Sequence, residues 1–280
     1  MKEMAPIRLG NLEVSRVEEM IWTVSPRFLC PGIPNAAFEP YRDWLVPHFS
    51  TSRYWWRLSI HTFVVRTPHH TILVDTCVGN DRNRSTIPAW HRMRTDYPAR
   101  LAAAGVVPEE VDYVLCTHLH ADHVGWNTRL EDGRFVPTFH RAEWDYWKNT
   151  QEAFHAQVVA DSLLPVVDAG LADLVAADHV IEDGVRLQHT PGHTAGHCSV
   201  LLGGGREGAI ITGDMLHHPF QIAEPHQSSR VCRDPALAAR TRIEFVERYA
   251  DTDTLVLGTH FAPPTAVRIA SGPRTCRATF

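Results

Sequence analysis

Short apolar runs separated by turn residues recur along the chain, and their spacing mixes strand and helix periods. Within residues 55–76, Leu58, Ile60 and Thr62 alternate with polar neighbours, a turn follows, and a second apolar run ends at Asp75. Alternation with a period of two on both sides of a short turn is typical of a β-hairpin. We therefore predict two paired strands here, with Asp75 at the end of the second.

Further strands and two helices follow this hairpin. Residues 97–105 predict a helix that stops at Gly105, and residues 235–250 predict a second helix with Asp234 as its N-cap. Prolines in residues 25–40 predict an ordered surface loop. Apolar runs predict strands at residues 113–117, 185–190, 198–202, 209–213 and 254–260. This mixture indicates an α/β protein.

Several of these predicted strands lead directly into histidine or aspartate. His118 follows residues 113–117, Asp214 follows residues 209–213, and His260 ends the last strand. A rigid sheet holds the groups at its strand ends in place, so catalytic and metal-binding residues favour such loops. The pattern predicts a functional site built from strand ends.

Composition and charge narrow the class of protein. The 280 residues are 44% hydrophobic, which suffices for a sizeable core, and the net charge of −5 comes without a run of like charge. Nucleic acid and anionic membrane surfaces are therefore unfavourable partners. The six cysteines are scattered without a C-x-x-C pair, which favours reduced thiols over a disulfide framework.

The beginning of the chain carries charges throughout and has no apolar stretch of the kind found in signal peptides. No apolar run reaches the length of a membrane span, so we expect a cytoplasmic protein. Without a linker or low-complexity tract, we expect one domain over residues 1–280 with an extended N-terminal segment at about 1–56. The expected partner is a small-molecule substrate. The sequence does not decide whether the protein forms a homodimer.

The segment CTHLHADHVGW (residues 116–126) concentrates chemistry-bearing side chains. Imidazole nitrogens and carboxylate oxygens are ligands that zinc takes readily. On an extended segment His118 and His120 point the same way, whereas Asp122 and His123 should follow where the chain turns into a helix. One ion cannot easily take four ligands from so short a stretch. Two metal ions sharing the motif are therefore the stronger interpretation, and a polar surface loop is the weaker one.

This H-x-H-x-D-H motif after a buried strand resembles the signature of the metallo-β-lactamase superfamily. The later motifs PGHT, TGDM and LGTHF supply His193, Asp214 and His260 in the order typical of that superfamily. The resemblance runs from about Val64 to His260 and implies an α/β fold of the four-layer αββα type. Asp75, in VDT, matches a carboxylate that supports the ligand loops without binding the metal itself.

The resemblance also implies two metal ions per chain, most naturally Zn²⁺, with other divalent metals as alternatives. Asp214 would bridge the two ions. The remaining ligands would divide into two sets, one of His118, His120 and His193 and the other of Asp122, His123 and His260.

The implied chemistry is attack by metal-bound hydroxide, which a pair of divalent ions makes available near neutral pH. Asp122 would orient the hydroxide or carry its proton, and His217 or His218 would face the substrate and supply a proton. The candidates for an apolar substrate pocket are Trp55, Trp56 and Phe220.

The fold alone does not choose the substrate. The N-terminal hairpin with VDTCVGND, VDYVLCTHLHADHVGW and GDMLHHP most resembles the branch with N-acyl homoserine lactonases and methyl parathion hydrolases. We expect a dinuclear zinc hydrolase that opens a lactone, such as an N-acyl homoserine lactone, or cleaves a carboxylic ester. The alternatives are hydrolysis of an organophosphate triester or a glyoxalase-like thioester, and a non-hydrolytic metal or redox protein on the same scaffold.

Overall fold

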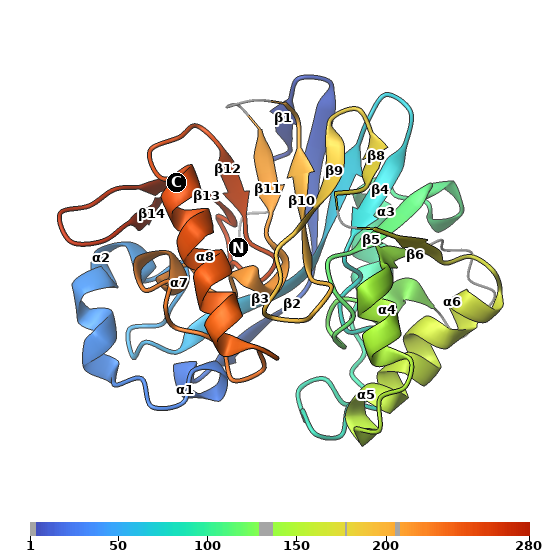
Figure 1. Cartoon of the computed structure of the whole chain (residues 1–280), viewed down its shortest axis with the longest axis horizontal. Helices are drawn as coiled ribbons and strands as arrows, with labels where there is room; N and C mark the ends of the chain where they lie inside the picture. The colour runs from blue at the N-terminus through green and yellow to red at the C-terminus, as the bar shows by residue number, and fades with distance from the viewer. Residues whose placement is uncertain (1–3, 129–136, 177, 205–207) are drawn as a thin grey trace. The chain divides into compact units, whose positions relative to one another are not determined.

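The computed structural model describes residues 4–128, 137–176, 178–204 and 208–280 (Figure 1). The chain forms two compact units. The terminal unit comprises Met1–Met4, Ile21–Ser59 and Val180–Phe280, and the central unit comprises Ala5–Met20 and Ile60–His179. The expected single domain with an N-terminal extension stays a prediction. Within the described ranges, no helix combines the length and the apolar character that crossing a bilayer requires.

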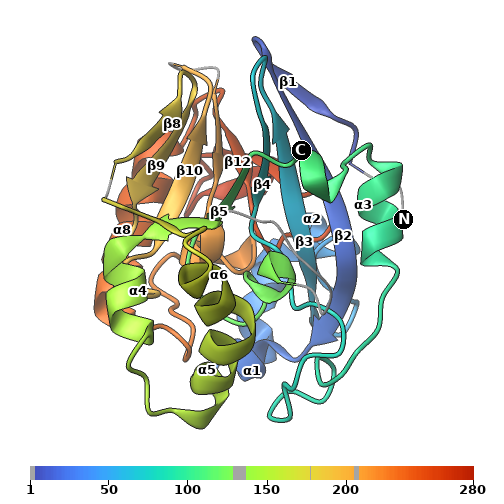
Figure 2. The same cartoon turned by 90° about the vertical axis from the view of Figure 1, so that its right-hand side faces the viewer.

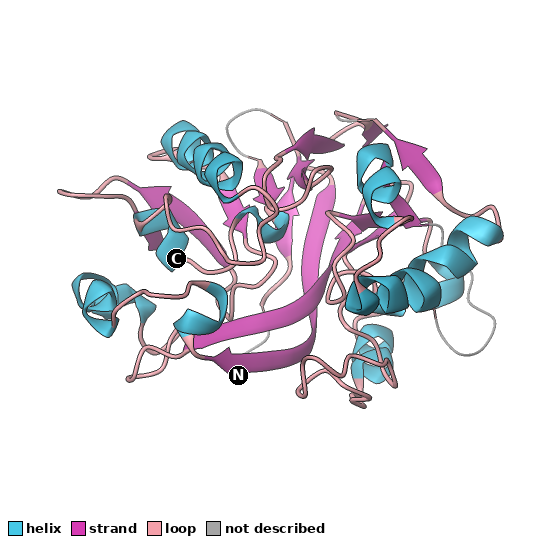
Figure 3. Ribbon diagram, turned by 60° about the horizontal axis from the view of Figure 1, so that its bottom comes forward, coloured by secondary structure: helices cyan, strands magenta, loops and turns pink. Residues whose placement is uncertain are grey.

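The central unit is built on a mixed sheet whose strands follow one another in chain order. Its parallel part runs from β4 to β7, and two antiparallel pairs, β1–β2 and β3–β4, lie at its other side. The long strands β2 and β3 are prominent in Figure 3. The strands are β1 (Ile7–Leu9), β2 (Leu12–Val24), β3 (Trp56–Arg66), β4 (Thr71–Val74), β5 (Tyr113–Cys116), β6 (Pro137–His140) and β7 (Asp173–Val175); β2 belongs to the central unit as far as Met20, and β3 from Ile60 on.

The predicted hairpin is confirmed, because β3 and β4 pair antiparallel with Phe63 opposite Val74. The helix predicted before Gly105 is α3 (Tyr97–Ala103), and the glycine adopts a φ of +70° after it. A left-handed residue after a helix is the usual helix-ending device, and glycine takes that conformation without steric strain.

Short helical segments accompany the parallel strands of the central unit. Among them, α4 packs beside β6 and β7 (Figure 2). The π-helical turn is tied down by Arg84, whose buried guanidinium makes two hydrogen bonds to Asp161 at 2.8 and 2.9 Å. The segments are the 3₁₀ helix Pro108–Glu110, α4 (Arg141–Trp147), α5 (Ala153–Val158), a π-helical turn at Val159–Leu163, and α6 (Leu164–Asp168).

The terminal unit carries a second sheet, in the order β14-β13-β12-β11-β10-β9-β8. Its pairs are antiparallel except β11–β12, which is parallel. The strands are β8 (Val180–Glu182), β9 (Val185–His189), β10 (Cys198–Leu202), β11 (Ala209–Ile211), β12 (Leu255–Leu257), β13 (Ala266–Ala270) and β14 (Arg277–Thr279). Because β11 and β12 run the same way, the residues after them leave the sheet at the same edge.

The connection between these parallel strands contains the second predicted helix, α8 (Pro235–Tyr249). The carboxylate of Asp234 accepts the Leu237 N–H at 2.9 Å, which confirms the predicted N-cap. The buried face of α8 includes Phe245 and Val246, which belong to the same core cluster as Val256 on β12.

The N-terminal part of this unit differs in detail from the prediction. Residues 25–40, predicted as an ordered surface loop, contain short helices: Pro26 stands at the start of α1, and Pro34 is the N-cap of the 3₁₀ helix. Phe38 of this segment is fully buried and packs at 4.6 Å, between ring centroids, from Phe220. The short helices are α1 (Pro26–Leu29), a 3₁₀ helix at Asn35–Tyr41, α2 (Arg42–Leu45) and α7 (Phe220–Ala223).

Candidate metal centre

The two histidines after β5 converge in the central unit, as their spacing predicts. Nε2 of His118 lies 3.0 Å from Nδ1 of His120, and His118 is fully buried. The Thr117 hydroxyl lies 3.1 Å from Nδ1 of His118. The Nε2 atom of His118 therefore faces the same point as Nδ1 of His120, as two ligands of one ion would.

Asp122 and His123 lie in a turn, which leads into a helix as predicted, and this helix is the short 3₁₀ helix Gly125–Asn127. The backbone N–H of Gly125 donates to the Cys77 carbonyl at 2.8 Å instead of to a preceding turn of helix. A Cβ at Gly125 would lie 1.9 Å from the Val78 carbonyl oxygen, so only glycine permits this close approach.

Asp75 ties this ligand segment to the end of β4. Its Oδ1 accepts the Thr117 N–H at 2.8 Å, and its Oδ2 accepts the Thr117 hydroxyl and the Nδ1–H of His123, each at 2.9 Å. The carboxylate is buried and its residue has a φ of +57°. Because Nδ1 of His123 carries the donated proton, Nε2 is the nitrogen suited to a metal. These are the contacts that the expected supporting role of Asp75 requires, and the role itself stays a prediction.

A second buried carboxylate, Glu143 on α4, was not found from the sequence. Its Oε1 accepts the backbone N–H of Leu119 at 3.2 Å and the indole N–H of Trp147 at 2.7 Å. Leu119 stands between the two histidines of the H-x-H segment. The sequence places Glu143 in an ordinary helix with no motif, so only the folded contact identifies it.

Glu19 on β2 is a third buried carboxylate of the central unit that sequence reasoning missed. It accepts the backbone N–H of Val78 at 2.8 Å and of Gly79 at 3.2 Å, and the indole N–H of Trp126 at 2.7 Å. Burial outweighs these hydrogen bonds and raises the pKa of Glu19 to about 7. The side chain joins the loop after β4 to the end of the ligand segment.

In the terminal unit, Asp214 follows β11 and turns its two carboxylate oxygens to different histidines. Oδ2 lies 3.4 Å from Nε2 of His193, whereas Oδ1 lies 3.0 Å from Nε2 of His260. His260 follows β12, the parallel neighbour of β11, which explains why the two groups meet at one edge of the sheet. A carboxylate placed in this way has the geometry of a bridging ligand.

The Nδ1 atoms of His193 and His260 both contact neighbouring protein groups. Nδ1–H of His260 donates to the Ser59 carbonyl at 2.9 Å, and the Ser59 N–H donates back to the His260 carbonyl at 2.9 Å. Nδ1 of His193 lies 3.6 Å from Sγ of Cys232. These contacts orient both rings so that Nε2 faces Asp214. Such outer contacts fix the tautomer of metal-binding histidines.

The sequence did not decide whether His217 or His218 faces the substrate. In the structure the two side chains lie in different surroundings. Nε2 of His217 lies 3.4 Å from Oδ2 of Asp214. His218 stacks on Trp56 with ring centroids 4.4 Å apart, and its Nε2–H donates to the Phe49 carbonyl at 2.8 Å. Burial lowers the pKa of His218 to about 3, so the ring is neutral. The geometry favours His217 over His218 as the catalytic candidate, and the catalytic role stays a prediction.

The aromatic candidates for a substrate pocket lie in different surroundings. Trp55 is 49% exposed, whereas Trp56 is fully buried in the core of the terminal unit. Phe220 is also buried and lines a pocket described below. Their roles toward a substrate stay predictions.

The donor set fits a divalent metal. In the central unit, the ligand atoms of His118 and His120 lie within 4.8 Å of each other, as do those of Asp122 and His123. In the terminal unit, the same holds for His193 and Asp214. Imidazole nitrogen with carboxylate oxygen is the ligand chemistry of zinc and its neighbours, and because Nδ1 of His123 and of His260 donates a hydrogen bond, Nε2 is the ring nitrogen left to bind a metal.

Sequence comparison connects this ligand set with a known family. The model of the Metallo-beta-lactamase superfamily matches residues 55–258. An N-acyl homoserine lactonase of Bacillus sp is 32% identical over 114 residues, which is 40% of this chain and 40% of that protein. Lactamase-like protein aptB of Emericella nidulans is 29% identical over 165 residues, 59% of this chain and 42% of that protein. The chain thus spans less than half the length of these curated relatives.

Solved structures agree on the fold. A hydrolase named AbOPH in the beta lactamase superfamily has a TM-score of 0.81 at 20% identity, over 99% of this chain and 97% of that one. AidC, described as a dizinc quorum-quenching lactonase in complex with its product, has a TM-score of 0.81 at 18% identity over the same shares. These likenesses confirm the predicted α/β fold class. With a family match that covers most of its length, the chain belongs to the metallo-β-lactamase superfamily.

Proposed function

We propose that this chain is a zinc-dependent hydrolase with a dinuclear site, and that its substrate is a lactone or a related carboxylic ester. The observation that carries this proposal is the placement of Asp214, whose two oxygens face His193 and His260 separately. A single ion would not require a carboxylate that presents one oxygen to each of two histidines. Asp214 would instead share its oxygens between two ions, one beside His193 and the other beside His260.

The remaining ligands complete the two sets that the superfamily implies. His118 and His120, whose ring nitrogens converge at 3.0 Å, would join His193 at one ion. Asp122 and His123 would join His260 at the other. When bound, the ions would acidify a water molecule and polarise the carbonyl of the substrate.

Side chains of the protein would transfer the protons of the reaction and hold the ligand loop in position. Asp122 would accept a proton from the attacking water at its carboxylate, since a carboxylate beside the reacting atoms serves as a general base. His217, next to Asp214, would hold the proton that the departing alkoxide requires. Asp75 and Glu143 would keep the ligand loop in place through their hydrogen bonds to Thr117 and Leu119.

A lactone is the preferred substrate class for two reasons. The matching Bacillus proteins are named N-acyl homoserine lactonases, and AidC is described as a lactonase with N-hexnoyl-L-homoserine as its product. The net charge of −5 also suits a neutral ring better than a polyanion. Thioester hydrolysis is the second candidate, because an Atrochrysone carboxyl ACP thioesterase of Aspergillus fumigatus is 27% identical over 165 residues.

A substrate panel tests this proposal. Zinc-loaded protein would be given N-acyl homoserine lactones, aliphatic lactones, aryl esters, a glutathione thioester, a phosphotriester and a cephalosporin, and proton release would be followed in weak buffer. We expect fast opening of lactones, slower hydrolysis of aryl esters and almost no reaction with the cephalosporin. Asp122→Asn should abolish turnover, whereas Asp112→Asn, an exposed aspartate of the same unit, should leave it unchanged. Turnover of the thioester or phosphotriester alone would refute the lactone assignment.

A further inference from the structure

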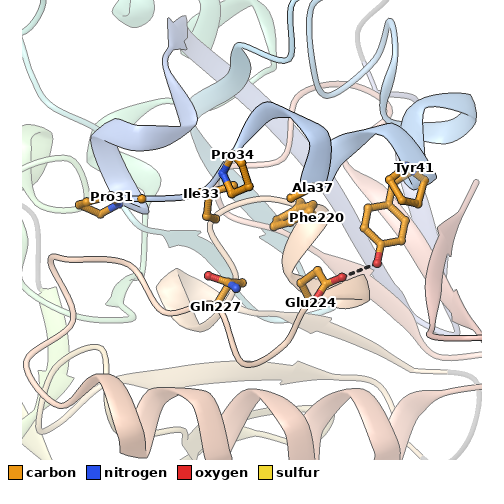
Figure 4. Close-up of a pocket in the computed structure, with 10 residues that line it drawn as sticks. Pro31, Ile33, Pro34, Ala37, Tyr41, Phe220, Glu224 and Gln227 are labelled. Atoms are coloured by element: carbon orange, nitrogen blue, oxygen red, sulfur yellow. Dashed lines mark hydrogen bonds between the residues drawn. The ribbon is translucent and has the colours of Figure 1, made fainter.

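The terminal unit contains a pocket that belongs to none of the proposed metal ligands. It has a volume of about 450 Å³, within the usual range for small-molecule sites. One wall comes from residues 31–41 and is largely apolar, with Pro31, Ile33 and Pro34, and Phe220 of α7 adds an aromatic ring (Figure 4). This wall suits a compact apolar group.

The other wall is polar and acidic. Glu224 and Gln227 lie opposite the proline-rich segment in Figure 4, and the described lining residues include no lysine or arginine. The guanidinium of Arg242 lies behind this wall, where it donates to the carbonyl oxygens of Pro225 and Gln227. The hydroxyl of Tyr41 donates a hydrogen bond to Oε1 of Glu224. That bond crosses from one wall to the other and fixes the carboxylate. The side chain of Glu224 remains 28% exposed.

Tyr41 cannot neutralise this acid by giving up its proton. Burial and the neighbouring Glu224 raise the pKa of Tyr41 to about 12, so the phenol stays a neutral donor. His226 lies beside the other oxygen, with Nε2 3.5 Å from Oε2, but its side chain is 60% exposed. An exposed imidazole at this distance offsets little of the negative charge. The pocket therefore offers a fixed anion beside apolar and aromatic faces.

The pocket is separated from the catalytic candidates by α7. His217 and His218 precede this helix and contact Asp214 and Trp56, whereas Phe220 and Glu224 line the pocket. The ring of Phe220 packs on Trp56, with centroids 6.1 Å apart. A ligand in the pocket would thus rest on the same short helix whose preceding residues face the metal site.

We propose that this pocket is a second ligand site, which binds a small organic cation: an ammonium group at Glu224 and an apolar body between the proline-rich wall and Phe220. A charge-assisted hydrogen bond to a fixed carboxylate is among the stronger polar contacts in proteins. The rings of Phe220 and Tyr41 add cation–π attraction when the charge lies over a ring face. This site goes beyond the proposed hydrolysis, since the lactone or ester group that is hydrolysed is itself neutral and requires no carboxylate partner for a cation.

Three probes of one shape test the charge requirement: benzylammonium, benzyl alcohol and benzoate. Each would be titrated into zinc-loaded, ¹⁵N-labelled full-length protein, and backbone chemical shifts would be followed by NMR. We expect benzylammonium to bind best, with shifts concentrated at residues 31–41 and 220–227, and benzoate to bind worst. Glu224→Gln removes the charge but keeps an oxygen for Tyr41, and it should weaken benzylammonium binding about tenfold, equivalent to losing about 1.4 kcal/mol.

Two further variants make the test independent of one substitution. Glu244→Gln removes an exposed acid on α8 and should leave binding unchanged. Ala37→Phe places a ring in the pocket and should prevent binding of all three probes while the spectrum remains that of a folded protein. Equal binding of benzoate and benzylammonium would overturn the proposal, as would shifts outside the pocket or benzylammonium binding that neither Glu224→Gln nor Ala37→Phe weakens.

Discussion

Replacing Asp75 by asparagine should weaken zinc binding through the tautomer of His123. The wild-type carboxylate accepts the Thr117 N–H through Oδ1 and the Nδ1–H of His123 through Oδ2. Asparagine can keep the first bond with its carbonyl oxygen, but its NH₂ group then faces Nδ1 of His123. Two donors cannot bond each other, so the imidazole proton moves to Nε2, the nitrogen proposed to bind the metal.

The size of the effect follows from the single bond that is lost. A hydrogen bond to a charged group contributes about 1.5–3 kcal/mol, and this one is fully buried. Binding of zinc would first have to restore the other tautomer without that bond. The expected loss is therefore about 10- to 100-fold in zinc affinity, the range usual for partners that orient metal-binding histidines.

Competition between the metal-free protein and a chromophoric zinc chelator measures this loss. Asp112→Asn is the matched control, because its carboxylate accepts an exposed backbone N–H, that of Thr71 at 2.8 Å, and contacts no proposed ligand among the described residues. Circular dichroism would verify that both variants are folded. Zinc affinity of Asp75→Asn equal to that of Asp112→Asn would refute the reasoning.

Three further perturbations test the packing around the ligand loop. Burial raises the pKa of Glu19 from 4.5 to about 7, so its stabilising contribution is complete below pH 4.5 and lost as the pH rises through 7. In denaturant unfolding of metal-free protein, the stability of the wild type relative to Glu19→Gln should therefore fall by about 3 kcal/mol between pH 4.5 and 8, and a constant difference would contradict this. Glu143→Leu removes the acceptor for the Leu119 N–H and should weaken zinc binding in the chelator assay, whereas Glu143→Gln, which keeps an oxygen, should restore most of it; equal affinities would exclude this role. Gly125→Ala forces a Cβ to within 1.9 Å of the Val78 carbonyl oxygen and should lower the free energy of unfolding by about 3 kcal/mol, whereas Gly204→Ala, which meets nothing within 4 Å, should change it little.

The sequence predicted the candidate site best where the proposed metal ligands follow directly after a strand. Because β11 and β12 are parallel neighbours, Asp214 and His260 had to leave the sheet at one edge, and they lie 3.0 Å apart. His118 and His120 follow β5 on an extended segment, where alternation alone puts both rings on one side. Local periodicity thus places each of these residues at a strand end, whereas the parallel pairing of β11 with β12 is seen only in the fold.

Supporting contacts were not predictable, because they join residues distant in the sequence. Glu143 and Glu19 carry no motif, and each acquires its role from a backbone N–H that the fold brings to it. The shortness of the helix after Asp122 has the same cause: the Gly125 N–H bonds to the carbonyl of Cys77, 48 residues earlier. His217 and His218 are adjacent and chemically identical, and only their folded surroundings distinguish them, with Asp214 beside His217 and Trp56 beside His218.

Zinc titration of chelator-treated protein, with metal content and lactone opening measured on the same samples, tests the dinuclear hydrolase most directly. We predict that bound zinc reaches about two ions per chain and that full activity requires the second ion, as in two-metal hydrolases. Asp214→Ala, which removes the bridging carboxylate, should hold fewer ions and lose activity. Saturation at one ion per chain, or lactone opening by the metal-free protein, would contradict the proposed site.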